Sequence, residues 1–408
     1  MEPATCIVRL STADGRHAPV LNSLDSPNSQ RGLATIESKA MPAELAKTIH
    51  ALLGRRDAPT DGVVDFCDFL GDALAARGIC LETVQVPWVD HGWPRALRSL
   101  REASQDWRGE WVLLQYSALA WSRRGFPVGA IRVARILQRN GAHVGVIFHD
   151  AVGFEIRRLY DRARLRIQYM IMRNLYDRSE RSILTIPPES VDWLPPNPSR
   201  VTFIPIGANI PEFLGDRSAA DRAVPTIAVF SITGGESGTT EIQDIAFAAR
   251  RARERLGAVR LEVFGRGAEN ARARLERALE GSGVALRLRG ILPAEEITRT
   301  LAGSDVLLFV RGLAASRRGT FVSGIACGLP VIGFGEAGVD PAIDAAGVRL
   351  VPWHDIERLA ETLTQVLADS NLRQQLHKRS VMAQTEFYSW DKIAGRYIDA
   401  LGLGGAAR

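Results

Sequence analysis

Two hydrophobic patterns alternate along the chain from about Ala43 onward. Runs of neighbouring apolar residues, such as EWVLLQY (110–116) and AHVGVIFHD (142–150), are typical of strands buried on both faces of a sheet. Between such runs lie amphipathic segments with helical spacing, such as VVDFCDFLGDALAARG (63–78) and GAIRVARILQRNG (129–141). A repeated strand–helix–strand order predicts a parallel sheet with helices on both faces.

A polar segment with two prolines, ANIPEFLGDRSAADRAVP (208–225), interrupts this alternation and predicts an interdomain linker. The alternation restarts at TIAVFSI (226–232) and continues to IERLAETLTQVLADS (356–370). The predicted fold class is therefore α/β, with two tandem Rossmann-like doubly wound domains and a cleft between them. Ligands of such sheets bind beyond the carboxyl ends of the strands.

The chain divides into four expected units. Residues 1–42 have no sustained period and are rich in Ser, Asn, Asp and Pro, so we expect a loosely ordered N-terminal extension. An N-terminal domain over 43–215 and a C-terminal domain over 216–380 follow it. The last unit, 381–408, contains the helical segment FYSWDKIAGRYIDAL.

The composition limits the kind of protein. The 408 residues are 46% hydrophobic and 24% charged, which is typical of globular domains and excludes wholesale disorder. The formal net charge of +5 suits an anionic ligand or an anionic membrane surface. The charge is modest and the sequence has no motif that reads nucleic acid, so we expect no nucleic-acid partner.

The predicted localisation is cytoplasmic. The N-terminus has no apolar signal segment, and no stretch reaches the roughly 18 apolar residues of a membrane span. Four cysteines without metal-ligand spacing favour buried thiols in a reducing compartment. The helical segment 154–181 carries eight arginines among Leu, Ile, Met and Tyr. Such a helix can lie peripherally on the inner membrane face, but an ordinary solvent-exposed helix is the simpler interpretation.

Two segments after predicted strands suit a bound phosphate. Arg317, Arg318, Gly319 and Thr320 open a predicted helix, whose free N–H groups attract anions, and the two guanidinium groups add bidentate donors. The segment GGESG (234–238) also follows a predicted strand and precedes a helix. Each has a plain alternative: a solvated arginine pair, and a glycine turn that merely redirects the chain.

The segment RRGTFVSGIACGLPVIGFGEAG (317–338) resembles the donor-site helix and following strand of retaining GT-B glycosyltransferases, especially family 4. VRLEVFGRGAE (259–269) is similar to the strand and glycine turn of that family's second domain, and RLRGILPAEEITRTLAGSDVLLFV (287–310) to the stretch that holds the nucleobase. FYSWDKIAGRYIDAL (387–401) resembles the terminal helix that crosses back to the first domain. LLQYSALAWSRRGFP and VIFHD resemble bacterial members that build surface polysaccharides. The resemblance covers about residues 45–402.

The resemblance implies transfer of a sugar from a nucleoside-diphosphate sugar to a saccharide or lipid-linked acceptor, with retention expected. It places the acceptor in the N-terminal domain and the nucleotide sugar in the C-terminal domain, and it implies no metal and no cofactor. The implied catalytic residues are His149, Asp150 and Arg318. The implied donor-binding residues are Gly234, Gly235, Gly265, Leu292, Arg317, Gly319, Thr320, Ser323 and Glu336, and the implied acceptor-binding residues are Gly62, Tyr116, Trp121 and Arg124.

The residues of the first domain have alternatives. The position of His149 at a strand end favours a hydrogen bond to a sugar hydroxyl, or stabilisation of charge near the anomeric carbon. Asp150 would serve as a general base if the enzyme inverted the configuration. A structural histidine would explain the first of these residues as well. Core aromatic residues explain Tyr116 and Trp121 equally well, and a turn glycine explains Gly62.

The sequence departs from the family at the donor helix, where two glutamates separated by seven residues usually bind the donor. Alignment on the Ala-Cys-Gly triplet (326–328) places Ser323 at the second glutamate and Ala315 near the first. A subset with Ser-Arg-Arg-Gly-Ser/Thr at this turn lacks the pair, and Glu336 could replace one carboxylate. Two alternatives stay open: a non-catalytic GT-B partner or regulatory protein, and a sugar-nucleotide epimerase.

Overall fold

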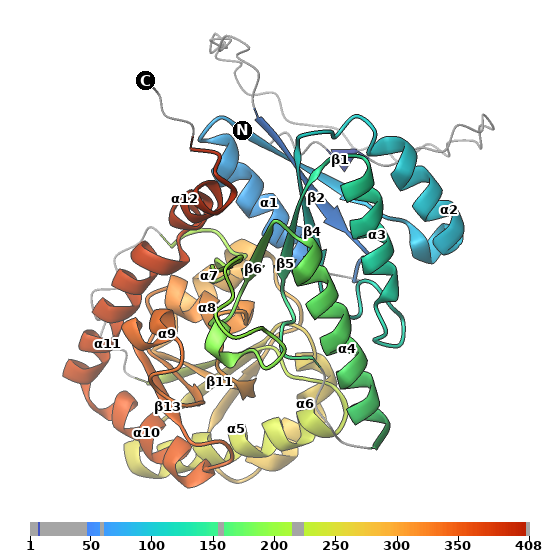
Figure 1. Cartoon of the computed structure of the whole chain (residues 1–408). Coiled ribbons are helices and arrows are strands. Elements are labelled where there is room, and N and C mark those ends of the chain that lie inside the picture. The colour runs from blue at the N-terminus through green and yellow to red at the C-terminus, as the bar shows by residue number, and fades with distance from the viewer. Residues whose placement is uncertain (1–6, 9–46, 58–60, 154–158, 214–223, 405–408) are drawn as a thin grey trace, which may run out of the picture.

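The computed structural model describes residues 7–8, 47–57, 61–153, 159–213 and 224–404, which form two α/β domains (Figure 1). Nearly all of the expected extension, 1–42, lies outside the described residues. Its one described part, β1 (Ile7–Val8), pairs in parallel with the edge of the first sheet.

The first domain contains a seven-stranded parallel sheet in the order β1-β3-β2-β4-β5-β6-β7. After β1, its strands are β2 (Lys47–Leu53), β3 (Ile79–Gln85), β4 (Trp111–Tyr116), β5 (His143–Phe148), β6 (Arg181–Leu184) and β7 (Val201–Phe203). Its described helices are α1 (Gly62–Ala75), α2 (Trp88–Ala103), α3 (Val128–Arg139), α4 (Leu159–Arg178) and the short η1 (Pro188–Ser190). In β4 and β5 every residue after the first is buried, as their unbroken apolar runs predict.

The second domain contains a six-stranded parallel sheet in the order β10-β9-β8-β11-β12-β13. Its strands are β8 (Thr226–Phe230), β9 (Arg260–Phe264), β10 (Ala285–Leu288), β11 (Val306–Leu313), β12 (Val331–Phe334) and β13 (Val348–Val351). Its helices are α5 (Gly235–Leu256), α6 (Ala268–Leu279), α7 (Ala294–Ala302), α8 (Gly319–Ala326), α9 (Pro341–Ala345), α10 (Ile356–Ala368) and α11 (Ser370–Ala383). The π-helical turn η2 (Gln384–Tyr388) and α12 (Trp390–Leu401) end the described chain.

The structure differs from the predicted elements at the start of α2. The strand predicted over 80–89 ends at Gln85, and the helix begins at Trp88, ahead of the predicted start at Pro94. Gly92 interrupts the helix with φ 72° and ψ 158°, a backbone conformation open to glycine and to few other residues. Because the helix is already interrupted at Gly92, Pro94 does not disrupt a regular helical turn.

The helix predicted over 154–181 corresponds to α4 (Leu159–Arg178), which ends before the predicted boundary because Arg181 already begins β6; residues 154–158 lie outside the described residues. Within α4, Arg164 pairs with Asp161 at 3.0 Å and Arg173 pairs with Asp177 at 3.2 Å, so part of its positive charge is neutralised. None of the helices that the structure describes is both long and apolar enough to cross a membrane. The predicted contact of this helix with a membrane surface stays a prediction.

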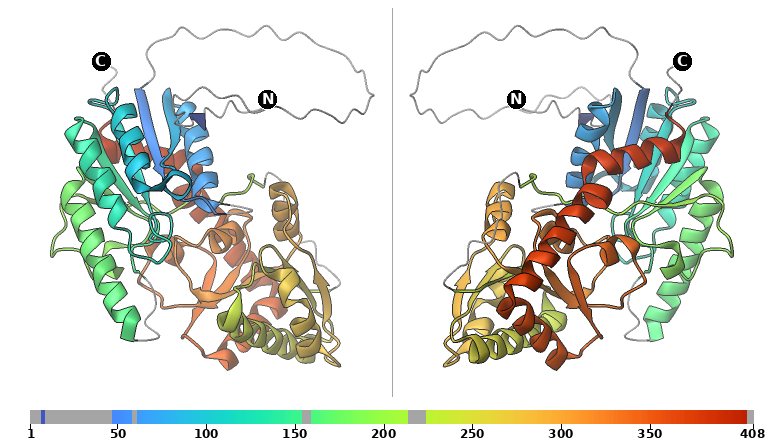
Figure 2. Two further views of the ribbon diagram at one scale, coloured as in Figure 1. Left: turned by 90° about the vertical axis from the view of Figure 1, so that its right-hand side faces the viewer. Right: turned by 90° about the vertical axis from the view of Figure 1, so that its left-hand side faces the viewer.

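Two segments connect the domains, and they are fastened to each other. One is the segment after β7, and the other leads into α12, which lies against α1 of the first domain (Figures 1 and 2). The indole N–H of Trp390 donates to the carbonyl of Ala208 at 2.9 Å. A Cβ at Gly207 would stand 2.5 Å from Cε2 of the same indole, so only glycine fits there. Trp390 also stacks on Phe69, with ring centroids 5.6 Å apart.

A continuous hydrophobic core joins the two domains. One cluster of buried side chains includes Ile49 and Leu70 of the first domain, Phe264 and Phe321 of the second, and Tyr397 of α12. The two sheets are therefore packed together as well as tethered.

Each strand order reverses at one point. In the first sheet β2 lies between β3 and β4, and in the second β8 lies between β9 and β11. A crevice beyond the carboxyl ends of the strands at such a point is the usual ligand site of a doubly wound sheet. The residues that follow β4, β5, β8 and β11 are therefore the ones to examine.

Candidate functional site

His149 stands at the carboxyl end of β5 and is held by Gln115 of β4. The imidazole Nε2 lies 2.8 Å from Gln115 Oε1, while Gln115 Nε2 donates to the carbonyl of Leu113 at 3.3 Å. This orientation of the amide makes His149 Nε2 the protonated nitrogen and leaves Nδ1 as an acceptor. Burial lowers the pKa of His149 to about 4, so the ring is neutral at pH 7. It can exchange hydrogen bonds with a hydroxyl but supplies no positive charge.

Asp150 and Arg317 join the two domains at the predicted site. Arg317 Nη1 donates to Asp150 Oδ1 at 3.5 Å, with 17% of the arginine side chain and 49% of the aspartate side chain exposed. The aspartate follows β5 and the arginine precedes α8, so the structure brings these two sequence-predicted residues together. The half-exposed carboxylate leaves the pair open to a ligand.

The start of α8 has the features of an anion site. Arg318 is the N-cap residue, and its side chain makes no capping hydrogen bond. The first N–H groups of the helix therefore lack a side-chain partner. Its guanidinium lies beside the end of β11, where Nη2 would be 3.3 Å from a Cβ at Gly312. Gly319 and Thr320, which form the first turn, are only partly buried.

Ser323 does not fit the donor-binding role predicted for it. Its side chain is 2% exposed, and its hydroxyl donates to the carbonyl of Gly319 at 2.8 Å, one turn back on the same helix. A short hydroxyl on a helix satisfies itself in this way instead of reaching outward. Ala315, near the position of the family's first glutamate, packs against the hydrophobic core of the first domain. Neither position offers a polar group to a sugar.

The two glycine turns of the second domain differ in what they do. A Cβ at Gly234 or at Gly235 would meet no atom within 4 Å, so the start of α5 borders open space. In the structure Gly235, predicted as part of a loop, is the first residue of this helix. A Cβ at Gly265 would be 2.7 Å from Ser231 Oγ, and φ there is +90°. Gly265 therefore allows its turn to pack closely against the residues at the end of β8. Gly234 and Gly235, in contrast, leave room for a ligand.

Arg311 was not predicted from the sequence, yet it lies beside the open turn that contains Gly234 and Gly235. It lies near the end of β11 and donates from Nε to Thr233 Oγ1 at 3.5 Å. Burial lowers the pKa of Arg311 below its usual value, and the nearby Glu241 carboxylate opposes that shift. The same carboxylate accepts a hydrogen bond from Thr233 N at 2.8 Å. The sequence signal for Arg311 is its position as a charged residue near the end of the otherwise apolar strand β11.

Asp244 lies on α5, one turn after Glu241, and is 6% exposed. Burial raises the pKa of Asp244 to about 6, the Glu241 charge adds to the increase, and His354 opposes it. A carboxyl whose pKa is higher in the folded than in the unfolded state stabilises the fold at low pH. That stability is lost as the pH rises toward 6 and above.

We therefore expect Asp244→Asn to be more stable than the wild type at pH 8, by up to about 3 kcal/mol at ~1.4 kcal/mol per pKa unit. The advantage should shrink as the pH falls from 7 toward 4, and urea unfolding across this range measures it. Glu254→Gln, an exposed change on the same helix, should have little effect. An equal advantage at every pH would show that the charge of Asp244 is not its cause.

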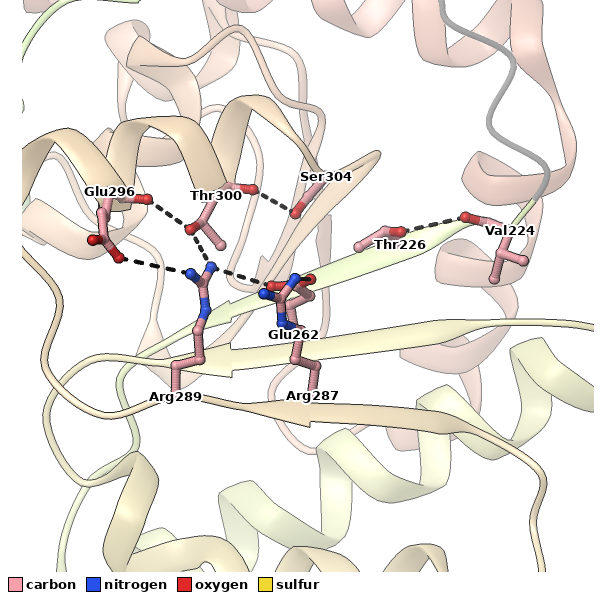
Figure 3. A network of polar contacts seen from close by, with 8 residues as sticks. All are labelled: Val224, Thr226, Glu262, Arg287, Arg289, Glu296, Thr300 and Ser304. Atoms are coloured by element: carbon pink, nitrogen blue, oxygen red, sulfur yellow. Dashed lines mark hydrogen bonds and ion pairs between the residues drawn. The ribbon is translucent and has the colours of Figure 1, made fainter.

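A polar network supports the loop that carries Leu292 (Figure 3). Glu262 of β9 accepts from Arg287 at 3.2 Å and from Arg289 at 3.4 Å. Arg289 also donates to Thr300 of α7, so the edge of the sheet is tied to the helix that follows the loop. Leu292 is partly buried against the core that the domains share. This network positions the segment that carries Leu292.

The other predicted residues are spread along the carboxyl edges of the two sheets. Tyr116 is fully buried and packs against Phe148 with centroids 5.4 Å apart, so it is a core residue and has no surface for an acceptor. Trp121 is 1% exposed but borders a pocket together with Arg124. Gly62 begins α1 and is exposed.

Two predictions stay open at this edge. Glu336, which follows β12, is exposed, and no hydrogen bond or ion pair within the described residues ties it to α8. In the described part of the chain, no group of three or more His, Cys, Asp or Glu side chains could hold a metal ion. The expectation of a site without metal or cofactor stays a prediction.

Comparison with known proteins identifies the second domain. Residues 236–369 match the family described as Glycosyl transferases group 1. This segment resembles a group 1 glycosyltransferase domain. That match includes Arg311 and all of α8, so the anion site lies inside the matched segment, and the open glycine turn at Gly234 and Gly235 directly precedes it. No curated protein sequence matches the chain.

Solved structures with similar folds extend this likeness to both domains of the chain. HepE from Anabaena in complex with UDP and glucose has a TM-score of 0.60 and 12% identity, over 88% of this chain and 100% of that chain. WaaG, a glycosyltransferase involved in lipopolysaccharide biosynthesis, has a TM-score of 0.60 and 16% identity over the same shares. A putative UDP-N-acetylglucosamine 2-epimerase from Listeria monocytogenes has 0.57 and 12%, over 87% and 96%. The predicted GT-B fold is confirmed over both domains.

Proposed function

We propose that this protein is a glycosyltransferase that moves a sugar from a nucleoside-diphosphate sugar to a saccharide or lipid-linked acceptor. The observation that carries the proposal is the pair of Asp150 and Arg317, 3.5 Å apart. It joins the end of a strand in the first domain to the start of α8 in the glycosyltransferase domain. A donor held by one domain would thus present its sugar to the other.

The second domain supplies what a diphosphate needs. The uncapped start of α8 and the guanidinium groups of Arg317 and Arg318 offer N–H donors and positive charge. The turn at Gly234 and Gly235 leaves open space at the start of α5. Arg311 lies beside this turn and adds a further guanidinium group. Negative charge grows on the diphosphate as the glycosyl bond breaks, so fixed cations there stabilise the transition state more than the ground state.

The groups of the first domain favour retention of configuration. His149 has a pKa of about 4 and is a weak base, and Asp150 is paired with Arg317. Inversion needs a strong base behind the sugar, and neither group is suited to that role. In a retaining transfer the acceptor oxygen forms its bond on the face that the diphosphate leaves. The departing phosphate oxygen takes the hydroxyl proton, and His149 Nδ1 accepts a hydrogen bond from a hydroxyl of the donor sugar.

Two alternative functions have specific support. The absence of a polar group at Ala315 and the burial of Ser323 favour a non-catalytic protein that binds nucleotide. The shared fold with a putative epimerase supports a reaction on the donor sugar alone. Turnover that requires an acceptor favours transfer over both, whereas a changed donor sugar without any acceptor identifies an epimerase.

A ligand screen tests the donor site first. We expect one nucleoside diphosphate, among UDP, GDP, ADP, CDP and TDP, to stabilise the protein by about 2.7 kcal/mol at 100 times its dissociation constant. The midpoint of thermal unfolding is the measurement, with the corresponding nucleosides as controls. If no diphosphate stabilises the protein more than its nucleoside does, the proposed donor site is wrong.

A further inference from the structure

A pocket of about 420 Å³ lies on the first domain, at the carboxyl ends of β3 and β4 and the start of α3. Its walls carry three indole rings and three guanidinium groups, from Trp88, Trp93, Trp121, Arg123, Arg124 and Arg132. Pockets of roughly 300–1,000 Å³ hold small ligands, and this one has room for one or two sugar rings.

The aromatic wall is rigid. Trp93 stacks on Trp88 with centroids 5.1 Å apart and 7° between the planes, and it lies 6.4 Å from Trp121 at 26°. The buried Trp88 is anchored by a hydrogen bond to the carbonyl of Ala120 at 3.0 Å. A Cβ at Gly129 would stand 2.1 Å from the Trp93 ring, so the glycine makes room for it. Because Trp93 is only partly buried, it presents an indole to the C–H face of a sugar.

Within the described residues, no carboxylate pairs with the arginines of the pocket. Arg123, Arg124 and Arg132 are exposed, and none of them forms an ion pair in the part of the chain that the structure describes. No carboxylate is among the lining residues. Guanidinium groups bind carboxylates and phosphates through paired hydrogen bonds, so three of them around one cavity select an anionic ligand.

The pocket and His149 share a support. The carbonyl of Gln115 accepts the indole N–H of Trp121 at 2.8 Å, and the side chain of Gln115 holds His149 Nε2 at the same distance. The pocket therefore belongs to the same sheet edge as the proposed point of transfer. A saccharide seated in it extends along this edge.

We infer that the acceptor is an acidic saccharide. Its sugar ring stacks on the tryptophan wall, and its anionic substituent, the carboxylate of a uronic acid or a sugar phosphate, binds Arg124 and its neighbours. The acceptor role rests on the proposed function, but the binding of an acidic sugar does not.

Calorimetry on the full chain tests this inference with three probes: an alginate tetrasaccharide, neutral mannotetraose and mannose 6-phosphate. We expect at least one acidic probe to bind about tenfold more tightly than mannotetraose, which corresponds to one charge-assisted contact. The acidic probe that binds more tightly shows whether the pocket prefers a carboxylate or a phosphate. The double variant Arg124→Gln/Arg132→Gln should lose this preference and keep its affinity for mannotetraose.

The matched control is Arg250→Gln/Arg255→Gln, which removes the same charge from exposed positions on α5 of the other domain. It should leave the preference for the acidic probe unchanged. Equal affinity for acidic and neutral probes, or equal losses in both double variants, would overturn the inference. Binding to anionic vesicles but to none of the saccharides would also overturn it and would identify a lipid surface.

Stabilisation by UDP, followed in the same proteins, separates the two proposals. If acidic saccharides bind and no nucleoside diphosphate does, the proposed donor site fails while the pocket stands. If UDP binds and no acidic saccharide does, the pocket inference fails alone.

Discussion

Replacing His149 with alanine is expected to lower the rate of sugar transfer at least about 100-fold, because removal of one transition-state hydrogen bond typically costs this much. Affinity for the nucleoside diphosphate should change little, since the other domain holds the phosphates. An effect on turnover without a matching change in ground-state binding marks an interaction made in the transition state. Single-turnover kinetics with a working acceptor, together with the dissociation constant for the diphosphate, measure both quantities.

His143→Ala is the matched control, because His143 begins the same strand and is exposed at the opposite end, where it pairs with Glu180. It should retain full turnover. The His149 variant could instead melt at a lower temperature and keep its rate. In that case the histidine is a structural residue beneath Phe66, on which it packs edge-on at 5.1 Å.

The double variant Arg317→Ala/Arg318→Ala should lose about 100-fold in affinity for a nucleoside diphosphate and almost nothing for the nucleoside. The lost contacts are to phosphate, and hydrogen bonds to charged groups contribute about 1.5–3 kcal/mol each. Calorimetry with UDP and uridine measures the difference. Equal losses for both ligands would place the arginines outside the phosphate site.

The partner of Arg317 requires a further variant. Without the arginine, Asp150 becomes an unpaired carboxylate that repels the diphosphate, and part of the loss would come from this repulsion. Adding Asp150→Asn to the Arg317→Ala variant removes that contribution. Affinity regained on adding it measures the repulsion, and the loss that remains belongs to the arginine.

The fold could be predicted because its physical causes are local. Strands such as β4 and β5 are covered on both faces, and an unbroken apolar run is the direct result. The boundary near Trp88 could not be predicted, because VPW continues the apolar pattern of the strand. Only the left-handed conformation of Gly92 allows a broken helix to start there.

The candidate site was predicted by position along the strands but not by the direction of each side chain. Residues at a strand end alternate between the faces of a sheet, and tertiary packing decides which of them is covered. Tyr116 is covered and Asp150 is half exposed, although Tyr116 ends β4 and Asp150 follows the end of the adjacent strand β5. The sequence predicted Trp121 and Arg124 of the pocket as acceptor-binding residues, but not Trp93, which reaches the pocket from α2 across a space that exists only through Gly129. Nothing in the sequence around Trp93 or around Gly129 indicates that these two residues are in contact.

The fastening of Trp390 to Gly207 and Ala208 decides how the two domains can move. Both segments that connect the domains contact each other at this point. A change in the interdomain angle therefore has to be a rotation about this contact. The ion pair of Asp150 and Arg317 is a second interdomain contact, and it holds the two sheet edges together. Breaking this ion pair is the change we expect when a donor enters, while the anchoring of Trp390 keeps the two sheet edges aligned.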